Sequence, residues 1–230
     1  MSKVSRHGRP PGFSSLTSIG IFMRYLILRA HDVDNSDKPD VVYLDFYDHA
    51  LPKPLALKAT LFDINSDGKL DWSLADDINN NGVADKLDEV MALEFAQQFM
   101  EFNWFSPDAP FDKYLKIFAE DFDANGIPDT VRLHFHQGEG EPRDETIAYT
   151  AALYKNGDGS GNGTTVSWDV NNDGKANAVD NELVRRFCRN FLVLGWHDAH
   201  PCKPPKKPNN PKPPKQPRKP VTPPRPKKTC

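Results

Sequence analysis

Oxygen-bearing side chains recur at a fixed spacing in five short stretches of this chain. "DINSDGKLD" begins at Asp63, and "DINNNGVAD" repeats its pattern 14 residues later, from Asp77. Each stretch has Asp at position 1, Asp or Asn at 3, an oxygen side chain at 5 and Asp or Asn at 9, usually with Gly at 6. Calcium takes about six to eight oxygen ligands, and positions 1, 3 and 5 of a tightly wound loop converge on one point. The spacing therefore predicts sites for a hard divalent cation.

The candidate ligands follow from this register. Side-chain oxygens are the expected donors, except at position 7, where the backbone carbonyl binds the ion. The expected cofactor is Ca²⁺, with about three to five ions bound. In chain order the candidate ligands are Asp32, Asp34, Ser36, Asp40, Asp63, Asn65, Asp67, Lys69, Asp71, Asp77, Asn79, Asn81, Val83, Asp85, Asp88, Asp121, Asp123, Asn125, Ile127, Asp129, Asp169, Asn171, Asp173, Lys175, Asn177 and Asp180.

Two of the loops depart from the pattern. The first has Ser36 at position 5 and Asp37 instead of glycine at position 6, so its sharp bend is less easy to form. The second has Leu74 at position 12, so its ligand shell must be closed by Asp71, by Asp76 or by water.

A sixth stretch, "NGDGSGNG" at 156–163, keeps the rhythm but has no acid at position 9, and we interpret it as a flexible hairpin tip. A simpler interpretation of every stretch is that Asp, Asn and Gly form turns. Turns alone do not require oxygen side chains at positions 1, 3, 5 and 9 in five separate stretches.

The loops resemble known calcium-binding motifs. "DVNNDGKANAVDNELVRRF" resembles one half of a dockerin repeat and an EF-hand loop, with Asp180 at position 12 in place of Glu. "DINNNGVADKLDEV" is similar, with Asp88 there. "DVDNSDKPDVVYLDF" and "DFDANGIPDTVRLHF" resemble the cation loops of FG-GAP and thrombospondin type 3 repeats. The resemblance covers the loops and their flanks and assigns the whole chain to no single family. Without a bidentate Glu, it implies affinities on the order of 10 µM to 1 mM.

The flanking residues predict the elements that hold the loops. Both sides of 32–40, 63–71 and 121–129 are rich in β-branched and aromatic residues, which favours strands. Helices are predicted after Asp85 and Asn177, where apolar residues recur at helical spacing. "ETIAYTAALYKNGDGSGNGTTVSW" is typical of a hairpin with a Gly-rich tip. The predicted fold class is α+β, with antiparallel strands connected by calcium-binding loops and two amphipathic helices. The predicted core stripes are Leu87, Met91, Phe95, Phe99 and Phe102, and Val184, Phe187, Cys188, Phe191 and Leu194.

Charge divides the chain into three parts. We expect a folded domain at 20–200 between a disordered basic segment at 1–19 and a tail at 201–230. The tail has 12 prolines, 10 basic residues and no acid, which is typical of a disordered, polyproline-II-like extension. Residues 31–200 hold 14 of the 29 basic residues and all 32 acids, a net charge of −18. This acidity favours bound cations and argues against nucleic acid as a partner.

Cysteine usage and hydropathy bear on the compartment. Cys188, Cys202 and Cys230 have no CxxC spacing, which argues against zinc and thioredoxin-like chemistry but leaves a Cys188–Cys202 disulfide and an intermolecular link open. No apolar run is long enough to span a membrane. The stretch 13–28 is interrupted by Arg24 and lacks a cleavage site, so it predicts an N-terminal strand and no clear signal peptide. Weak calcium affinity then favours an extracellular, cell-surface or periplasmic location.

No catalytic motif is present: there is no nucleophile elbow, P-loop or dinucleotide-binding glycine pattern. The histidine pairs His134/His136 and His197/His200 lack a third ligand nearby in the sequence. We therefore expect no enzyme but a secreted or surface-exposed calcium-binding structural or adhesion protein, whose ions rigidify its loops. The alternatives are a dockerin-like interaction module that binds through a helix at 178–194, and a calcium-stabilised carbohydrate-binding or enzyme domain. Candidate partners are a second copy of the chain, a surface protein or a polysaccharide.

Overall fold

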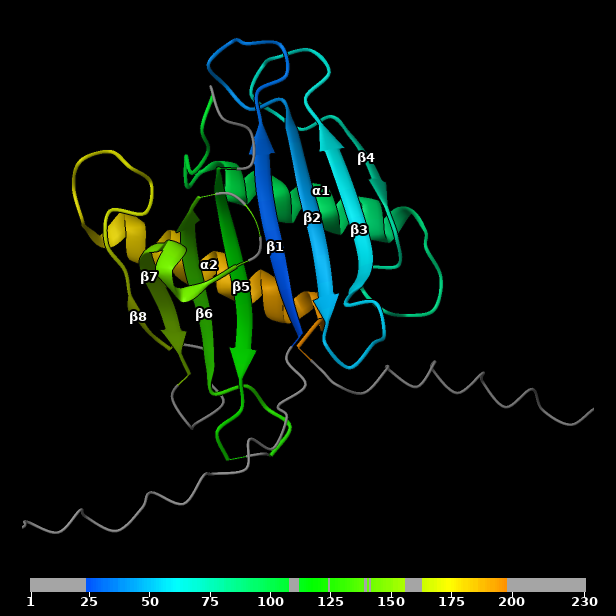
Figure 1. Ribbon diagram of the computed structural model, residues 1–230, viewed down its shortest axis with the longest axis vertical. Coiled ribbons are helices and arrows are strands. Elements are labelled where there is room, and N and C mark those ends of the chain that lie inside the picture. The colour runs from blue at the N-terminus through cyan, green and yellow to red at the C-terminus, as the bar shows by residue number, and fades with distance from the viewer. Residues whose placement is uncertain are drawn as a thin grey trace, which may run out of the picture.

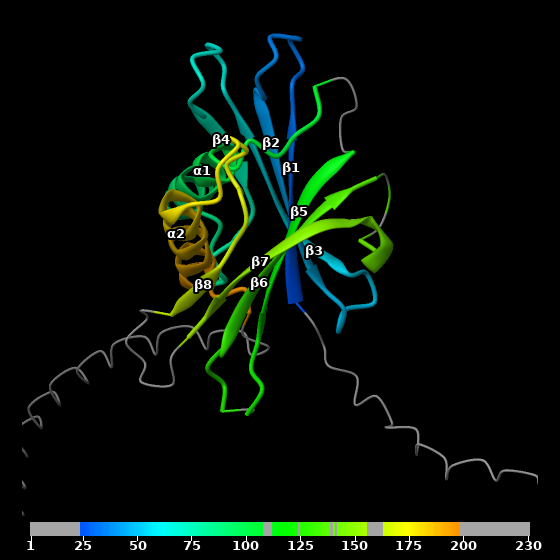
Figure 2. The ribbon, with the colours of Figure 1, turned by 90° about the vertical axis from the view of Figure 1, so that its left-hand side faces the viewer.

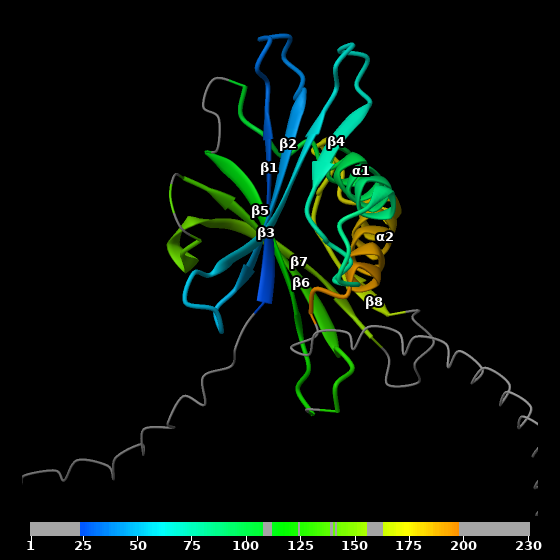
Figure 3. The same cartoon turned by 90° about the vertical axis from the view of Figure 1, so that its right-hand side faces the viewer.

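The α+β class predicted from the sequence is confirmed. Eight strands form one antiparallel sheet, and two helices lie together on one of its faces (Figures 2 and 3). The predicted segments 1–19 and 201–230 lie outside the residues that the structure describes. This structure, a computed structural model, describes residues 24–107, 112–123, 125–138, 140, 142–155 and 163–197.

The elements follow the predicted order. Strands flank three of the acidic stretches, each helix begins at the end of another, and the predicted hairpin pairs β7 with β8. The elements are β1 (Arg24–His31), β2 (Val41–Asp48), β3 (Leu55–Phe62), β4 (Trp72–Ala75), α1 (Lys86–Met100), β5 (Lys113–Glu120), β6 (Thr130–Gln137), a 3₁₀ turn η1 (Asp144–Thr146), β7 (Ile147–Tyr154), β8 (Thr164–Val166) and α2 (Ala178–Leu194).

The two halves of the chain have the same fold, which the sequence analysis missed. Each half contains four strands followed by a helix, and the sheet order is β4-β3-β2-β1-β5-β6-β7-β8 (Figure 1). "RYLILRAHDVDNSDKPDVVYLDF" from Arg24 aligns without a gap with "KYLKIFAEDFDANGIPDTVRLHF" from Lys113. Residues 55–104 align in the same way with 147–196. The protein is therefore an internal duplication, with the two halves joined through β1 and β5.

A pseudo-two-fold axis relates the halves. Ile27 pairs with Lys116 across the antiparallel β1–β5 contact, and these two residues are also equivalent in the repeat. A residue pairs with its own equivalent only at the axis, so the axis passes between them, normal to the sheet. In the helix layer the equivalent rings of Phe95 and Phe187 stack with their centroids 4.4 Å apart. The same axis therefore runs through both layers.

Each half anchors the end of its helix on the other half. Trp104, which follows α1, donates its indole N–H to the backbone oxygens of Tyr114 and His136, both at 3.2 Å. Trp196, which follows α2, donates to the backbone oxygen of Tyr25 at 3.2 Å. Because Trp104 is equivalent to Trp196 and Tyr114 to Tyr25, the contacts are reciprocal. They fasten the two halves together across the axis.

The core lies between the sheet and the helices. The predicted stripe of α2 is buried throughout. In the first helix the prediction is wrong for Leu87, which is 54% exposed. Each step of four residues moves a side chain by about 40° around the helix axis. Three such steps separate Leu87 from Phe99, so the two point in different directions. Ala92 and Ala96 are buried and complete the core face of α1 instead.

Cys188 is a free thiol buried in this core, so it does not form the disulfide with Cys202 that the sequence left open. Burial raises the pKa of the Cys188 thiol, which keeps it protonated and unreactive. Cys202 and Cys230 lie outside the described residues. Neither helix of the described chain is both long and apolar enough to cross a bilayer.

Candidate metal centres

All five acidic loops have the same hydrogen-bond scheme. In the loop at 63–71, the backbone N–H of Asp67 donates to Asp63 Oδ1 (3.2 Å) and Asn65 Oδ1 (3.0 Å). The N–H of Gly68 donates to Asp63 Oδ2 at 2.7 Å. The equivalent donors and acceptors recur in the other four loops. Each loop therefore folds around its position-1 carboxylate and draws positions 3 and 5 toward it.

This winding requires a left-handed backbone at position 6. Glycine supplies it in four loops, with φ between 84° at Gly126 and 94° at Gly82. In the first loop Asp37 adopts φ 64°. A residue with a Cβ is strained there by about 1 kcal/mol, so the bend forms at a cost that the other loops avoid.

The loops between strands are closed by the acid at position 9, which folds back over the start of the loop. Of the two acids that the sequence offered for closing the loop at 63–71, Asp71 does so. Asp76 accepts the backbone N–H of Lys58 instead. In each of these loops the backbone N–H at position 2 donates to the carboxylate at position 9. Val33 donates to Asp40 at 3.0 Å, Ile64 to Asp71 at 3.2 Å, and Phe122 to Asp129 at 2.7 Å.

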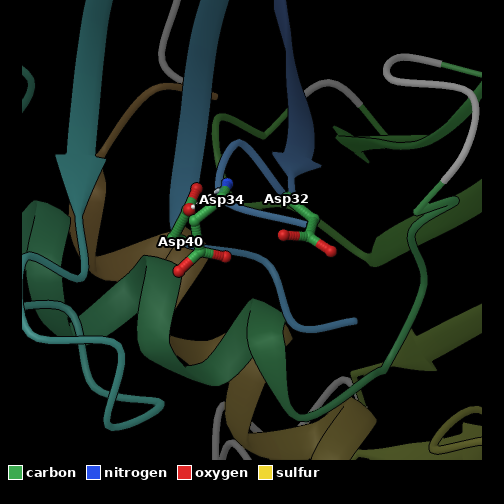
Figure 4. Close-up of side chains that lie close together, drawn as sticks. All are labelled: Asp32, Asp34 and Asp40. Atoms are coloured by element: carbon green, nitrogen blue, oxygen red, sulfur yellow. Dashed lines mark hydrogen bonds between the residues drawn. The ribbon is translucent and has the colours of Figure 1, made fainter. Parts of the chain in front are cut away.

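The loop between β1 and β2 gathers three carboxylates. Oxygens of Asp32, Asp34 and Asp40 all lie within 4.8 Å of one another, and Figure 4 shows them gathered in the bend. Asp32 is only 4% exposed. Hydrogen bonds from Ser36 and then from Ser66 hold the pKa of Asp34 below its usual value, so this carboxylate stays ionised. Close, ionised carboxylates repel one another, and a bound cation relieves that repulsion.

The loop between β5 and β6 gathers three carboxylates in the same way. Oxygens of Asp121, Asp123 and Asp129 also lie within 4.8 Å of one another. In the described part of the chain, no third loop brings three acids, histidines or cysteines so close. The other three loops have Asn at position 3. The sequence pattern accepts Asp or Asn at position 3, so it predicted all five loops alike.

The two carboxylate clusters occupy equivalent positions in the two halves. They lie at opposite ends of the sheet, since β1 and β5 run antiparallel (Figure 1). The loop at 63–71 lies beside the first cluster, and Ser66 Oγ donates to Asp34 Oδ2 at 2.8 Å. In the second half the corresponding stretch of sequence is the Gly-rich segment at 155–163, which has no acid at the positions equivalent to Asp63, Asp67 and Asp71. Its tip, at 156–162, lies outside the described residues.

The loops that begin helices are built differently. Position 9 is the N-cap and position 12 is the third helical residue, so the two form a capping box. Asp88 is fully buried and accepts the backbone N–H groups of Asn79 (3.1 Å) and Asp85 (2.9 Å). Asp180, also fully buried, makes the equivalent bonds to Asn171 and Asn177. These two predicted ligands therefore hold each loop against its helix.

The remaining predicted ligands occupy the loop interiors. In four loops the N–H of the position-7 residue donates to the side-chain oxygen at position 5, at 2.7 to 2.9 Å. Ser36, at position 5 of the first loop, accepts no such bond among the described residues, and its hydroxyl donates to the backbone oxygen of Lys38 at 3.4 Å. The position-7 residues are Lys69, Val83, Ile127 and Lys175.

The donor set fits a hard cation. Carboxylate, amide and hydroxyl oxygens surround each bend, and no sulfur or imidazole of the described residues joins the two clusters. Oxygen-only sites select calcium or magnesium over softer metals. The apolar face of α2 is buried against the sheet, so the dockerin-like alternative would have to use its outer face.

No known protein family, curated protein or solved structure matches this chain. The geometry of the loops therefore carries the functional argument.

Proposed function

We propose that this protein binds calcium at its two carboxylate clusters and that the ions rigidify the molecule for a structural or adhesive role outside the cytosol. The primary sites are Asp32, Asp34 and Asp40 in one half and the loop at 121–129 in the other. The three loops with Asn at position 3 are weaker secondary sites, because they do not gather three carboxylates within 4.8 Å of one another as the two clusters do.

One observation carries the proposal: the equivalent loops of two diverged halves both keep Asp at positions 1, 3 and 9. In the strands beside them several residues facing away from the helices differ between the halves, as Tyr43 and Arg132, and Asp45 and His134, illustrate. A turn needs only a flexible residue and a hydrogen bond, so turn formation alone does not account for three retained acids.

Calcium suits these loops better than magnesium. Magnesium requires near-ideal octahedral geometry and keeps several waters, whereas calcium accepts irregular shells of carboxylate, amide and backbone oxygens. Neither cluster has a bidentate Glu in its loop, so we expect dissociation constants on the order of 10 µM to 1 mM. Such affinities are typical of extracellular modules, which supports a secreted or surface-exposed location.

Calorimetric titration of calcium into chelator-treated protein tests the proposal, with thermal melting of the same samples. At about 100 times its dissociation constant, each ion adds about 2.7 kcal/mol to the free energy of unfolding. Asp34→Asn and Asp123→Asn each remove one cluster charge, and each should weaken one site by about tenfold or more. Magnesium, titrated in parallel, should bind more weakly at both clusters.

Glu182→Gln is the matched control, because Glu182 lies on the exposed side of α2 and its ion pair among the described residues is with Arg185. It should leave both affinities unchanged. Absence of heat and of any rise in melting temperature at about 10 mM calcium would rule out the proposal. The loops would then be polar turns.

A further inference from the structure

Each of the three acidic hairpin loops carries an exposed apolar side chain at position 2. Val33, Ile64 and Phe122 are 55%, 71% and 65% exposed. The two loops that begin helices have Ile78 and Val170 at the same position, and both of these side chains are fully buried. The same kind of residue therefore packs into the core in one type of loop and faces solvent in the other.

The exposed apolar side chains are held in place and are kept in both halves. In each hairpin loop the backbone N–H at position 2 donates to the carboxylate at position 9, at 2.7 to 3.2 Å. Val33 and Phe122 are equivalent in the repeat, so both halves have an apolar residue at this exposed position. At position 7, which is also exposed, the halves differ, with Lys38 in the first and Ile127 in the second. Exposure alone therefore does not account for the apolar residue at position 2.

The three hairpin loops project beyond the two ends of the sheet. The loops at 32–40 and 63–71 project from one end (Figures 2 and 3), and they lie side by side, since Ser66 Oγ donates to Asp34 Oδ2 at 2.8 Å. These two loops form the first tip. The loop at 121–129 projects from the opposite end and forms the second tip. The exposed apolar side chains thus lie at the two extremes of the folded domain.

Charged groups accompany the apolar side chains at both tips. Each tip contains one of the two carboxylate clusters. The first tip also has Lys38 and Lys69, which are both exposed, and the second has Ile127, which is 61% exposed. Without calcium the carboxylates repel an anionic surface, whereas bound calcium and the lysines attract one. The charge of the calcium-loaded tips therefore complements anionic lipid headgroups.

This mixture of apolar and ionic groups favours a lipid surface as the partner. Phe122 lies between Asp121 and Asp123 in the chain. A protein groove that buried Phe122 would also remove these carboxylates and their ion from water, which is costly. At a bilayer the apolar side chain enters the boundary of the acyl chains while the ions stay level with the headgroups. A lipid surface therefore accommodates both kinds of group at once.

We propose that both tips bind anionic phospholipid bilayers. The apolar pairs that insert among the headgroups are Val33 with Ile64 at the first tip and Phe122 with Ile127 at the second. Because the tips lie at opposite ends of the domain, one molecule binds two bilayers and holds them together. The calcium dependence of this binding rests on the proposed function, and the bilayer gives the adhesive role a partner of defined chemistry.

Co-sedimentation of the full-length chain with lipid vesicles tests the binding. The vesicles contain phosphatidylcholine alone or phosphatidylcholine mixed with phosphatidylserine. At about 1 mM calcium the protein should bind the mixed vesicles about tenfold or more tightly than it binds phosphatidylcholine vesicles, or mixed vesicles in chelator. Calorimetric titration of calcium without vesicles, on the same samples, measures ion binding separately.

Turbidity of the vesicle suspension tests the two tips, because vesicles held together scatter more light. Val33→Ser with Ile64→Ser alters the first tip, and Phe122→Ser with Ile127→Ser alters the second. Each double variant should still bind vesicles through its intact tip but should cluster them about tenfold or more slowly. The variant altered at both tips should bind mixed vesicles about tenfold or more weakly. Val193→Ser is the matched control, because Val193 is 71% exposed on α2, outside both tips, and this variant should behave as the natural chain does.

All of these substitutions replace exposed side chains, so the melting temperature should not fall. If calcium binds in solution but the mixed vesicles are not bound, the lipid proposal is wrong and the proposed function stands. Equal vesicle binding by the variant altered at both tips would likewise overturn the insertion of the apolar side chains. Equal binding in calcium and in chelator would overturn the role given to the ions, and undiminished clustering by either double variant would overturn the bridging of two bilayers.

Discussion

The two halves agree on the helix-covered side of the sheet and differ on the open side. Toward the helices, Phe95 corresponds to Phe187 and Phe46 to Phe135, and all four are buried. On the open face, Asp45 corresponds to His134. Core residues must fit one another at close packing, so few substitutions are tolerated there. The open face is packed only around a small cluster of Tyr25, Ile27, Tyr114 and Phe118, and in the second half ionisable groups are buried beside it.

Some of the acidic loops are likewise kept in both halves and one is not. The loop between the first two strands of each half keeps its three carboxylates in both halves, and the helix-starting loop keeps its capping box. The outer hairpin keeps its acids only in the first half, at 63–71. Two of the three loops are therefore common to both halves: one gathers three carboxylates and the other caps a helix.

The largest expected effect tests the equivalence of the cores. Phe95→Ala and Phe187→Ala each remove one ring of the stacked pair on the axis, and each should lower the free energy of unfolding by about 3 to 5 kcal/mol. Guanidinium unfolding of both variants measures the losses. A loss below about 1 kcal/mol for either variant would show that the two halves do not share one core.

A smaller effect distinguishes the open faces. The folded-state pKa of His136 is about 4, below the ordinary 6.5. Between these values the unfolded chain takes up a proton that the folded one does not, so stability falls as the pH falls. We expect a loss of about 2 kcal/mol from pH 7 to pH 5.

His136→Tyr, which restores the residue of the first half, should remove the contribution of His136 to this slope. Part of it should remain, because burial also lowers the pKa of His134. Thermal melting at the two pH values in chelator measures the difference. Equal slopes in the variant and the natural chain would contradict the burial of a neutral imidazole.

The smallest effect concerns the bend of the first loop. Asp37→Gly supplies at position 6 the residue that the second half has at Gly126, and it removes the left-handed strain. The free energy of unfolding should rise by about 0.5 to 1 kcal/mol in chelator. Ser36→Gly is the control: its neighbour keeps φ 64°, so no gain is expected. An unchanged or lower free energy of unfolding for Asp37→Gly would mean that the Asp37 carboxylate stabilises the loop by more than the left-handed backbone costs.

The local elements could be predicted from the sequence because their signals are local. The acidic stretches between β-branched runs became hairpins, and the helices begin at Asp85 and Asn177 as expected. The prediction failed at Leu87 because its spacing fits a helix, but its position around the helix axis lies off the buried face. The difference between the loops was missed because the rule accepts Asn65 and Asp34 alike at position 3, although only Asp34 adds a charge to a cluster.

The duplication could have been predicted from the gapless alignment of 24–46 with 113–135, whereas the neighbours of the open-face residues could not. The halves align only when their loops are superimposed, and the residues that differ most, such as Ile27 and Lys116, lie at the axis itself. His134 and His136 were expected to share one face of a strand, and they do, with ring centroids 6.1 Å apart. Their neighbours come from β5 and η1, which only tertiary structure brings to them.

The reciprocal tryptophan contacts have a consequence for the origin of the molecule. A chain consisting of one half would expose the long edge of its first strand, and its tryptophan would have no backbone oxygen to bind. Two such chains would satisfy each other through the same antiparallel pairing and the same exchange of indole contacts. This protein therefore has the architecture of a symmetric homodimer fused into a single chain, and the fusion freed each half to evolve its own surface.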